Sequence, residues 1–287
     1  MTADELVALF DLEPAGEDRF VGHSPHNGWR RVFGGQVLAQ ALVAAERTVT
    51  GRDPHSLHAY FILGGDPREP IAFEVERVRD GRSFTTRRIV ARQKGEAIFV
   101  MTASFHAAEP GFDHATPPPE APAPEACVDP RIATEKLEGQ ARFRMKGFLD
   151  SIWPIDFRPT DLARYTPSAG REPRQTLWTR IGERLPDDPA LHRAALVYLS
   201  DFSMIDTALV AHGRTLWDPK IQIASLDHAM WFHRPARADE WLLYVQDSPS
   251  AGGGRGLVRG AVYARDGALV ASVAQEGLIR PKRDREG

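Results

Sequence analysis

The sequence predicts an α+β fold in which a long antiparallel sheet wraps around one central helix, twice in a single chain. Two observations support this prediction. Two distant segments of the 287 residues follow the same order of strands and turns, and an apolar helical segment comes before the long strands of each. Internal repetition of this kind means that one structural unit is used twice.

The strand pattern has two copies. Each copy has a short run, SLHAYF or SLDHAMWF, followed by three longer strands that are separated by turns containing DG, KG or a run of glycines. Such turns join antiparallel neighbours, so each half should contain a long antiparallel meander. The predicted strands cover residues 56–61, 71–78, 83–93 and 97–106 in the first half, and 225–232, 241–247, 255–265 and 268–280 in the second.

The two predicted helices cover residues 34–48 (GGQVLAQALVAAERT) and 201–212 (DFSMIDTALVAH). Neither has a polar face over most of its length, and small residues such as Ala41 and Ala208 would let a sheet approach closely. A helix that is apolar nearly all round is a buried helix. A long sheet curled around one buried helix is the hotdog arrangement, and two in tandem make a double hotdog.

Composition suggests the domain boundaries. Residues 115–130 (ATPPPEAPAPEACVDP) are too rich in proline for a helix or a sheet interior, so we expect an N-terminal hotdog at 1–114, a linker at 115–130 and a C-terminal hotdog at 131–287. Residues 131–189 should hold a helix or two and an opening strand near 175–181. Thr2 and Glu5 have the spacing of a capping box, which predicts a short N-terminal helix.

The bulk composition excludes several classes of protein. The chain has 36 basic and 39 acidic residues, a formal charge of −3 and no block of like charge that would bind nucleic acid or a membrane surface. No apolar run reaches the roughly 18 residues of a membrane helix. Cys127 is the single cysteine, so no internal disulfide can form. We expect a cytoplasmic protein without nucleic-acid or membrane partners.

Several catalytic motifs are absent. The run GGGRG (252–256) does not fit the dinucleotide fingerprint, and the sequence has neither a Walker A motif nor a G-x-S-x-G nucleophile elbow. His55 and His58 lie three apart beside a strand, where such positions face opposite sides, and Asp227, His228 and His233 offer no better metal spacing. The sequence therefore predicts no metal and no cofactor.

Two polar residues interrupt apolar runs. Asp201 stands where the run 196–213 becomes helical, and its simplest role would be an N-cap of that helix. Gln275 interrupts LVASVA in the last strand, where a buried amide requires hydrogen-bond partners. Asp206 follows Asp201 by five residues, about 140° around a continuous helix, so the two should not face one pocket. His58 is a competing general base because of its titration range.

Six segments carry a family resemblance. RVFGGQVLAQAL, HSLHAYFILGGDP, DGRSFTTRRIVARQKGEAIFVMTASFH, YLSDFSMIDTAL, IQIASLDHAMWFHRP and GLVRGAVYARDGALVASVAQEGLIR resemble the type II acyl-CoA thioesterases, which are double-hotdog enzymes of the TesB kind. The segments cover most of the chain outside the linker and the middle region. The resemblance implies hydrolysis of acyl-CoA thioesters to fatty acid and CoA, and a homodimer or homotetramer.

The resemblance also assigns site residues. The catalytic positions of the family fall on Asp201, Ser225 and Gln275, with Ser225 standing where Thr is commoner. A carboxylate flanked by a hydroxyl and an amide can orient a water molecule and accept its proton. Backbone amides of Gly34 and Gly35 are candidates for binding the carbonyl oxygen. Candidate pocket residues, which ordinary core packing would also explain, are His58, Phe33, Phe61, Met204, Met230 and Trp231.

The repeat provides an internal comparison. Aligning the halves puts a neutral residue of the first half against each predicted catalytic residue of the second: Gln36 near Asp201, Ser56 opposite Ser225 and Ala103 opposite Gln275. The first half has no matching carboxylate or amide. We therefore predict one active site per chain.

Two other functions remain open on sequence alone. A non-catalytic acyl-CoA sensor could have the same fold, because fold does not dictate activity. A hotdog enoyl-CoA hydratase or dehydratase would act on the double bond and not on the thioester. Crotonyl-CoA separates the two reactions, because hydration removes the double bond whereas hydrolysis releases a thiol.

Overall fold

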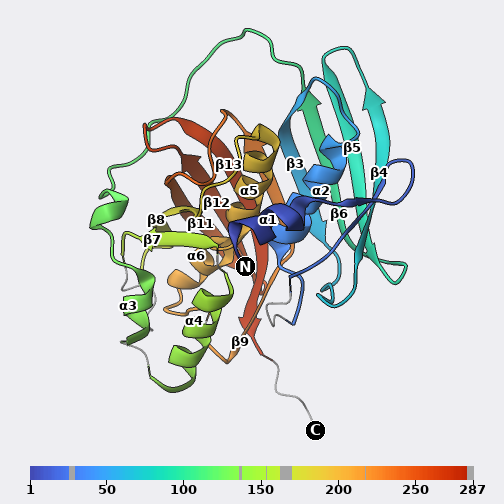
Figure 1. Ribbon diagram of the computed structural model, residues 1–287. Helices are drawn as coiled ribbons and strands as arrows, with labels where there is room; N and C mark the ends of the chain where they lie inside the picture. The colour runs from blue at the N-terminus through green and yellow to red at the C-terminus, as the bar shows by residue number, and fades with distance from the viewer. Residues whose placement is uncertain (26–29, 136–137, 153, 162–169, 217, 283–287) are drawn as a thin grey trace.

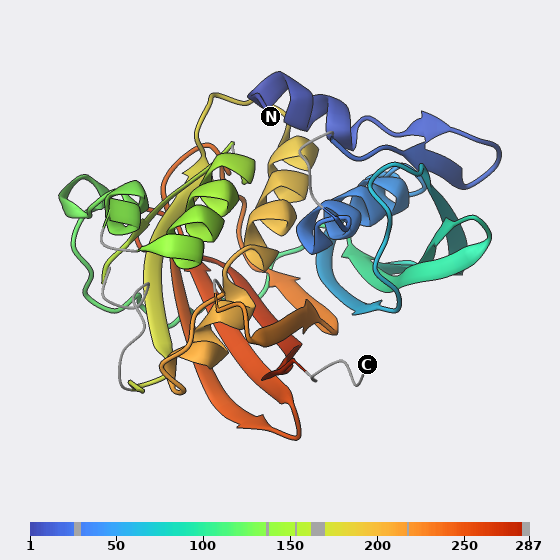
Figure 2. The ribbon, with the colours of Figure 1, turned by 90° about the horizontal axis from the view of Figure 1, so that it is seen from below.

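The computed structural model describes residues 1–25, 30–135, 138–152, 154–161, 170–216 and 218–282 (Figure 1). In this part of the chain, 13 strands form one antiparallel sheet. Twelve of them have the order β1-β2-β4-β5-β6-β3-β10-β13-β12-β11-β8-β7, and β9 pairs with β13 beside this path. Two halves lie side by side along this sheet, as Figure 2 shows from below.

In the first half, the sheet wraps around α2 (Gly34–Glu46), which contacts β2 to β6. The meander has the predicted order, and α2 ends two residues earlier than predicted. Its strands are β3 (Asp53–Phe61), β4 (Ile71–Asp80), β5 (Phe84–Gln93) and β6 (Glu96–His106), with β1 (Glu13–Pro14) and β2 (Arg19–Gly22) at the edge. The capping box of α1 (Ala3–Phe10) is confirmed, since the Thr2 side chain accepts from Glu5 N at 3.2 Å.

In the second half, the sheet packs on α6 (Met204–Val210), which contacts β8 and β11 to β13. The predicted opening strand is present as β8 (Arg174–Ile181). The other strands are β7 (Ile155–Pro159), β9 (Ile221–Ser225), β10 (Asp227–Phe232), β11 (Leu242–Gly252), β12 (Arg255–Tyr263) and β13 (Leu269–Pro281).

The segment between the halves runs over the outside of the molecule (Figure 1). The proline-rich residues 115–130 contain only a single 3₁₀ turn, η1 (Pro124–Ala126), before α3 begins. Two helices follow on the outer side of the second half, α3 (Pro130–Glu135) and α4 (Gly139–Ser151). This agrees with the helices expected after residue 131.

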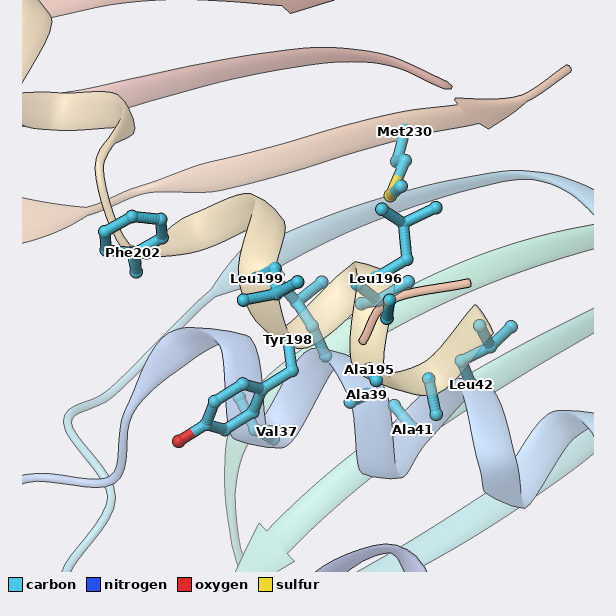
Figure 3. Packing of buried hydrophobic residues seen from close by; sticks show 14 of the residues in the cluster. Val37, Ala39, Ala41, Leu42, Ala195, Leu196, Tyr198, Leu199, Phe202 and Met230 are labelled. Atoms are coloured by element: carbon cyan, nitrogen blue, oxygen red, sulfur yellow. The ribbon is translucent and has the colours of Figure 1, made fainter. Parts of the chain in front are cut away.

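The halves meet along two contacts. β3 pairs antiparallel with β10, with Leu57 opposite Met230, so the sheet is continuous across the junction. On the inner side of the sheet, α2 packs against α5 (Pro189–Asp201). Figure 3 shows the small residues of α2, such as Ala41, facing Ala195 of α5. The predicted double hotdog is confirmed: both helices lie in one continuous apolar core.

The second central helix differs from the prediction. The sequence predicts one helix over 201–212, but α5 ends at Asp201 and α6 begins at Met204. Side chains from the sheet satisfy the backbone at this break: the Tyr244 hydroxyl donates to Ser200 O at 2.9 Å and Gln175 Nε2 to Ser203 O at 3.2 Å. The local sequence does not show such partners from distant strands, and its apolar pattern by itself favours a continuous helix.

Candidate active site

Asp201, Ser225 and Gln275 come from three separate elements and meet at the helix break. Gln275 Nε2 on β13 donates to Asp201 Oδ1 at 2.7 Å and to Ser225 Oγ at 2.9 Å, and Ser225 Oγ at the end of β9 donates to Asp201 Oδ1 at 3.3 Å. Asp201 is 8% exposed and Gln275 is 1% exposed. Two of these bonds end on the same oxygen of a nearly buried carboxylate, and the third joins the two donors.

The location of Asp201 corrects the N-cap interpretation. Asp201 is the last residue of α5, and the residue that precedes α6 is Ser203. A carboxylate at the C-terminal end of a helix faces the negative end of the helix dipole, which is unfavourable. The other oxygen, Oδ2, lies next to the first residue of α2, since a Cβ built on Gly34 would be 2.5 Å from it. The positive end of α2 therefore offsets the charge.

The start of α2 has free backbone donors. Phe33 in the N-cap position makes no side-chain capping bond, and the first backbone bonds to its carbonyl come from Gln36 and Val37. Within the described residues, the N–H groups of Gly34 and Gly35 donate to no protein acceptor. Both lie at the positive end of a 13-residue helix, and Gly34 lies beside the Asp201 carboxylate. This is an arrangement that stabilises an oxyanion.

Two cavities share this location. The carboxylate cavity has a volume of about 460 Å³ and contains Asp201, Asp206 and Phe33, with the exposed side chains of Arg30 and Arg31 among its lining residues. The apolar cavity has a volume of about 310 Å³ and is lined mainly by hydrophobic residues. These include Val37, Phe61, Ile98, Phe99 and Leu226. The residues that line both cavities are Arg31, Val32, Gly34, Ile223, Ala224 and Ser225.

Asp206 is not excluded from the site. Asp201 and Asp206 line the same cavity, which contradicts the expectation that they face different directions. The angle of about 140° assumed a continuous helix. The break between α5 and α6 removes that assumption. Asp206 is buried, with 6% of its surface exposed.

Five of the predicted pocket residues line neither cavity: Gly35, His58, Met204, Met230 and Trp231. His58 is exposed on the outer face of β3, where its ring meets Trp231 edge-on with 5.2 Å between centroids. Met230 is fully buried and points toward Leu196 in the core (Figure 3). Neither residue lines either cavity. Alternation along β3 explains the position of His58, because the sequence alone did not show which face of the strand is internal. Met230 is on the internal face of β10 but packs in the core, away from both cavities.

The remaining candidates divide in the same way. Phe33, Phe61 and Gly34 line the cavities. Gly35 is needed for packing, because a Cβ there would be 2.5 Å from the carbonyl oxygen of Tyr198. Met204 is fully buried, and its Sδ accepts a hydrogen bond from the Tyr244 hydroxyl at 2.8 Å.

His228 lies behind the site, a position that no sequence pattern predicted. It is 0% exposed, and its Nε2 is 2.9 Å from Ser200 Oγ. Burial lowers the pKa of its imidazole, and the Asp201 charge and Gln275 oppose that shift. The spacing of Asp227, His228 and His233 bears on metal ligation and does not predict this contact. Among the described residues, no group of three His, Cys, Asp or Glu side chains is arranged to hold a metal.

The chain matches known families over both halves. The profile of the acyl-CoA thioesterase N-terminal domain matches residues 23–106, and the acyl-CoA thioesterase profile matches residues 150–278. Human acyl-coenzyme A thioesterase 8 is 38% identical over 96% of this chain and 89% of its own length. The chain belongs to the acyl-CoA thioesterase family.

Other relatives of this thioesterase agree. Acyl-CoA thioesterase 2 of Haemophilus influenzae is 36% identical over 96% of this chain and 97% of its own length. The crystal structure of acyl-CoA thioesterase II TesB2 from Mycobacterium marinum is similar with a TM-score of 0.80 at 42% identity, covering 96% of this chain and 98% of that one. No helix in the described part of the thioesterase is long and apolar enough to cross a membrane.

Proposed function

We propose that the enzyme hydrolyses acyl-CoA thioesters by direct attack of a water molecule, with Asp201 as the general base. The observation that carries the proposal is the asymmetric environment of the Asp201 carboxylate. Oδ1 accepts hydrogen bonds from Gln275 and Ser225, whereas Oδ2 faces Gly34 at the start of α2. Ser225 and Gln275 position the carboxylate, and through it the water whose proton Oδ2 accepts.

The thioester carbonyl binds between Oδ2 and the start of α2. Its oxygen accepts hydrogen bonds from the free N–H groups of Gly34 and Gly35, which support the negative charge that develops during attack. The water oxygen bonds to the carbonyl carbon, the carbon–sulfur bond then breaks, and the thiolate takes up a proton. A thiol has a pKa near 8.5, so the leaving group requires little acid assistance.

The two cavities suggest where the halves of the substrate bind. The acyl chain enters the apolar cavity, where Phe61, Ile98 and Phe99 remove it from water. The CoA part leaves through the carboxylate cavity, where the guanidinium groups of Arg30 and Arg31 are available to phosphates. The shared border at Gly34 and Ser225 is then the location of the thioester.

The first experiment measures thiol release from acyl-CoAs of two to eighteen carbons by the wild type and by Asp201→Asn. We expect a chain-length-dependent rate in the wild type and a loss of about a thousandfold or more in kcat in the variant, because the general base is removed. Unchanged folding and ligand binding serve as the control. An undiminished rate in the variant would show that another group is the base.

A second experiment tests the assignment of the acyl chain. Ile98→Phe fills part of the apolar cavity and should shift the preferred acyl chain to shorter lengths, with acetyl-CoA hydrolysis retained. Val100 lies on the outer face of the same strand and is absent from the cavity lining. Val100→Phe is therefore the matched control and should keep the wild-type profile. A shifted profile in both variants would remove the assignment.

We also propose a cytoplasmic location and a homodimeric or homotetrameric state. A relative from Saccharomyces cerevisiae, 26% identical, is named a peroxisomal acyl-coenzyme A thioester hydrolase, so location differs among relatives. Cell fractionation tests the first point. Light scattering on the purified chain tests the second, and a monomer at assay concentration would contradict it.

A further inference from the structure

His228 and Gln275 are buried neighbours on adjacent strands. β10 pairs with β13 so that Ala229 is opposite Ala274, which brings His228 next to Gln275 across the two strands. His228 is 0% and Gln275 is 1% exposed, so both side chains face the interior. Nε2 of the His228 imidazole is 2.9 Å from Ser200 Oγ of α5.

Two buried polar atoms at this location, one on Gln275 and one on His228, lack a hydrogen-bond partner in the described part of the chain. Both Nε2 hydrogens of Gln275 are used, one on Asp201 and one on Ser225. Gln275 Oε1 and His228 Nδ1 are both buried, and neither has a hydrogen bond of ordinary geometry among the described residues. A carboxamide oxygen can only accept. The two atoms can therefore satisfy one another only when Nδ1 carries a hydrogen.

We propose that neutral His228, in its Nδ1–H tautomer, is a positioning residue that fixes the orientation of the Gln275 carboxamide, with the Ser200 hydroxyl donating to Nε2. The hydrogen-bond chain then runs from Ser200 through His228 and Gln275 to Asp201 Oδ1. This inference rests on the proposed role of Asp201, because its effect on the reaction passes through that carboxylate.

The tautomer matters because a carboxamide has two orientations. A bare Nδ1 would attract the NH₂ group of Gln275, and turning the amide would place Oε1 against Asp201 Oδ1. The carboxylate would then lose its 2.7 Å donor and face a second acceptor. The Nδ1–H tautomer opposes that rotation. His228 thereby determines which end of Gln275 the catalytic carboxylate meets.

The surroundings of His228 favour the neutral ring. Burial lowers its pKa, while the nearby Asp201 and Asp227 charges and the Gln275 side chain act in the opposite direction. Tyr244 also lies on the buried side, and its hydroxyl donates to Ser200 O. The Ser200 hydroxyl has two acceptors within reach, Val197 O at 2.8 Å and His228 Nε2 at 2.9 Å, and only one hydrogen to donate. The proposed tautomer requires that this hydrogen is donated to Nε2.

Nitrogen NMR on protein with ¹⁵N-labelled histidine tests the tautomer directly. The His228 signals are identified by their loss in His228→Asn. We expect a protonated Nδ1 and an unprotonated Nε2 at neutral pH in the wild type. A protonated Nε2 with a bare Nδ1, or a doubly protonated ring, would overturn the inference. This readout does not require turnover, so it holds even if the proposed hydrolysis fails.

Matched variants test the positioning role. Asn and Leu have similar shapes, but only Asn can donate from near the Nδ1 position. His228→Leu should lower kcat about 10- to 100-fold with little change in KM, the range typical of supporting hydrogen bonds. His228→Asn should retain most of the wild-type kcat. Equal losses in both variants, or no loss in His228→Leu, would show that the ring acts by packing alone.

His233 provides the control. It forms the same kind of pair, with Nε2 at 2.9 Å from Ser272 Oγ, on the exposed side of the same segment. His233→Leu should leave kcat unchanged. If His228→Leu fails to fold, the tautomer and the His228→Asn kinetics still decide the question. Absence of thiol release from the wild type would instead count against the proposed function.

Discussion

Substitution of Gly34 by alanine tests the site with a single methyl group. A Cβ at this position would be 2.5 Å from Asp201 Oδ2 and 3.1 Å from two ring carbons of Phe61. A normal contact begins near 3.4 Å, so the carboxylate oxygen must retreat by about 0.9 Å. Asp201 cannot rotate away freely, because Gln275 and Ser225 bind its other oxygen.

The expected result is a selective loss of rate. A displacement of about 1 Å in a catalytic group costs on the order of a hundredfold, so kcat for the best acyl-CoA should fall about a hundredfold. Stability should change little, since alanine gains up to about 1 kcal/mol in helix propensity over glycine. Thiol release gives the rate, and urea unfolding gives the stability.

Gly147 in α4 supplies the control, because a Cβ there meets no atom within 4 Å and its φ is not positive. Gly147→Ala should keep the wild-type kcat. If Gly34→Ala also kept it, the start of α2 could not border the reacting carbonyl. If Gly34→Ala lowered kcat only in proportion to a loss of folded protein, the steric argument would be wrong as well.

Three further predictions follow from individual contacts. Ser225→Ala should lower kcat about tenfold by removing one hydrogen bond to Asp201, whereas Ser225→Thr should match or exceed the wild type, because its β-branch restricts the hydroxyl; both are read by thiol release. Gln36→Asp should create no second turnover site in an Asp201→Asn background, and any recovered activity would contradict the one-site prediction. Burial raises the pKa of Glu46 to about 7 against the opposing Arg193, so its contribution to stability is complete below pH 4.5 and is lost as pH rises through 7. Glu46→Gln should abolish that decline in the free energy of unfolding, which amounts to up to about 3 kcal/mol between pH 5 and 8. Urea unfolding measures the free energy at each pH, and an unchanged slope in the variant would refute the assignment.

The strands and their order could be predicted because each is a local pattern. Alternating hydrophobicity and DG or KG turns specify a hairpin within some twenty residues. The helix break at Asp201 could not, because the groups that stabilise it, Tyr244 and Gln175, come from distant strands. The failure to place Asp206 followed directly from that missed break.

The candidate site could likewise be predicted only in part. Resemblance located Asp201, Ser225 and Gln275, and the structure brings them within hydrogen-bonding distance, although their catalytic roles remain predictions. His228 was missed because a histidine in an apolar alternation has no distinctive local signal. The basic pair Arg30 and Arg31, three residues before the glycines of α2, was visible in the sequence but had no structural context.

The two halves differ at the positions on which the prediction of one site per chain depends. In the first half, Gln36 donates to His23 O at 3.2 Å and to Ser24 Oγ at 2.9 Å, so its amide stabilises a loop. In the second half, the helix is broken and the carboxylate of Asp201 lies at the end of α5, against the start of the first-half helix. The proposed base thus comes from one half and the proposed oxyanion donors from the other. Neither half alone could assemble this site, which gives the fused repeat a function beyond burying a larger core.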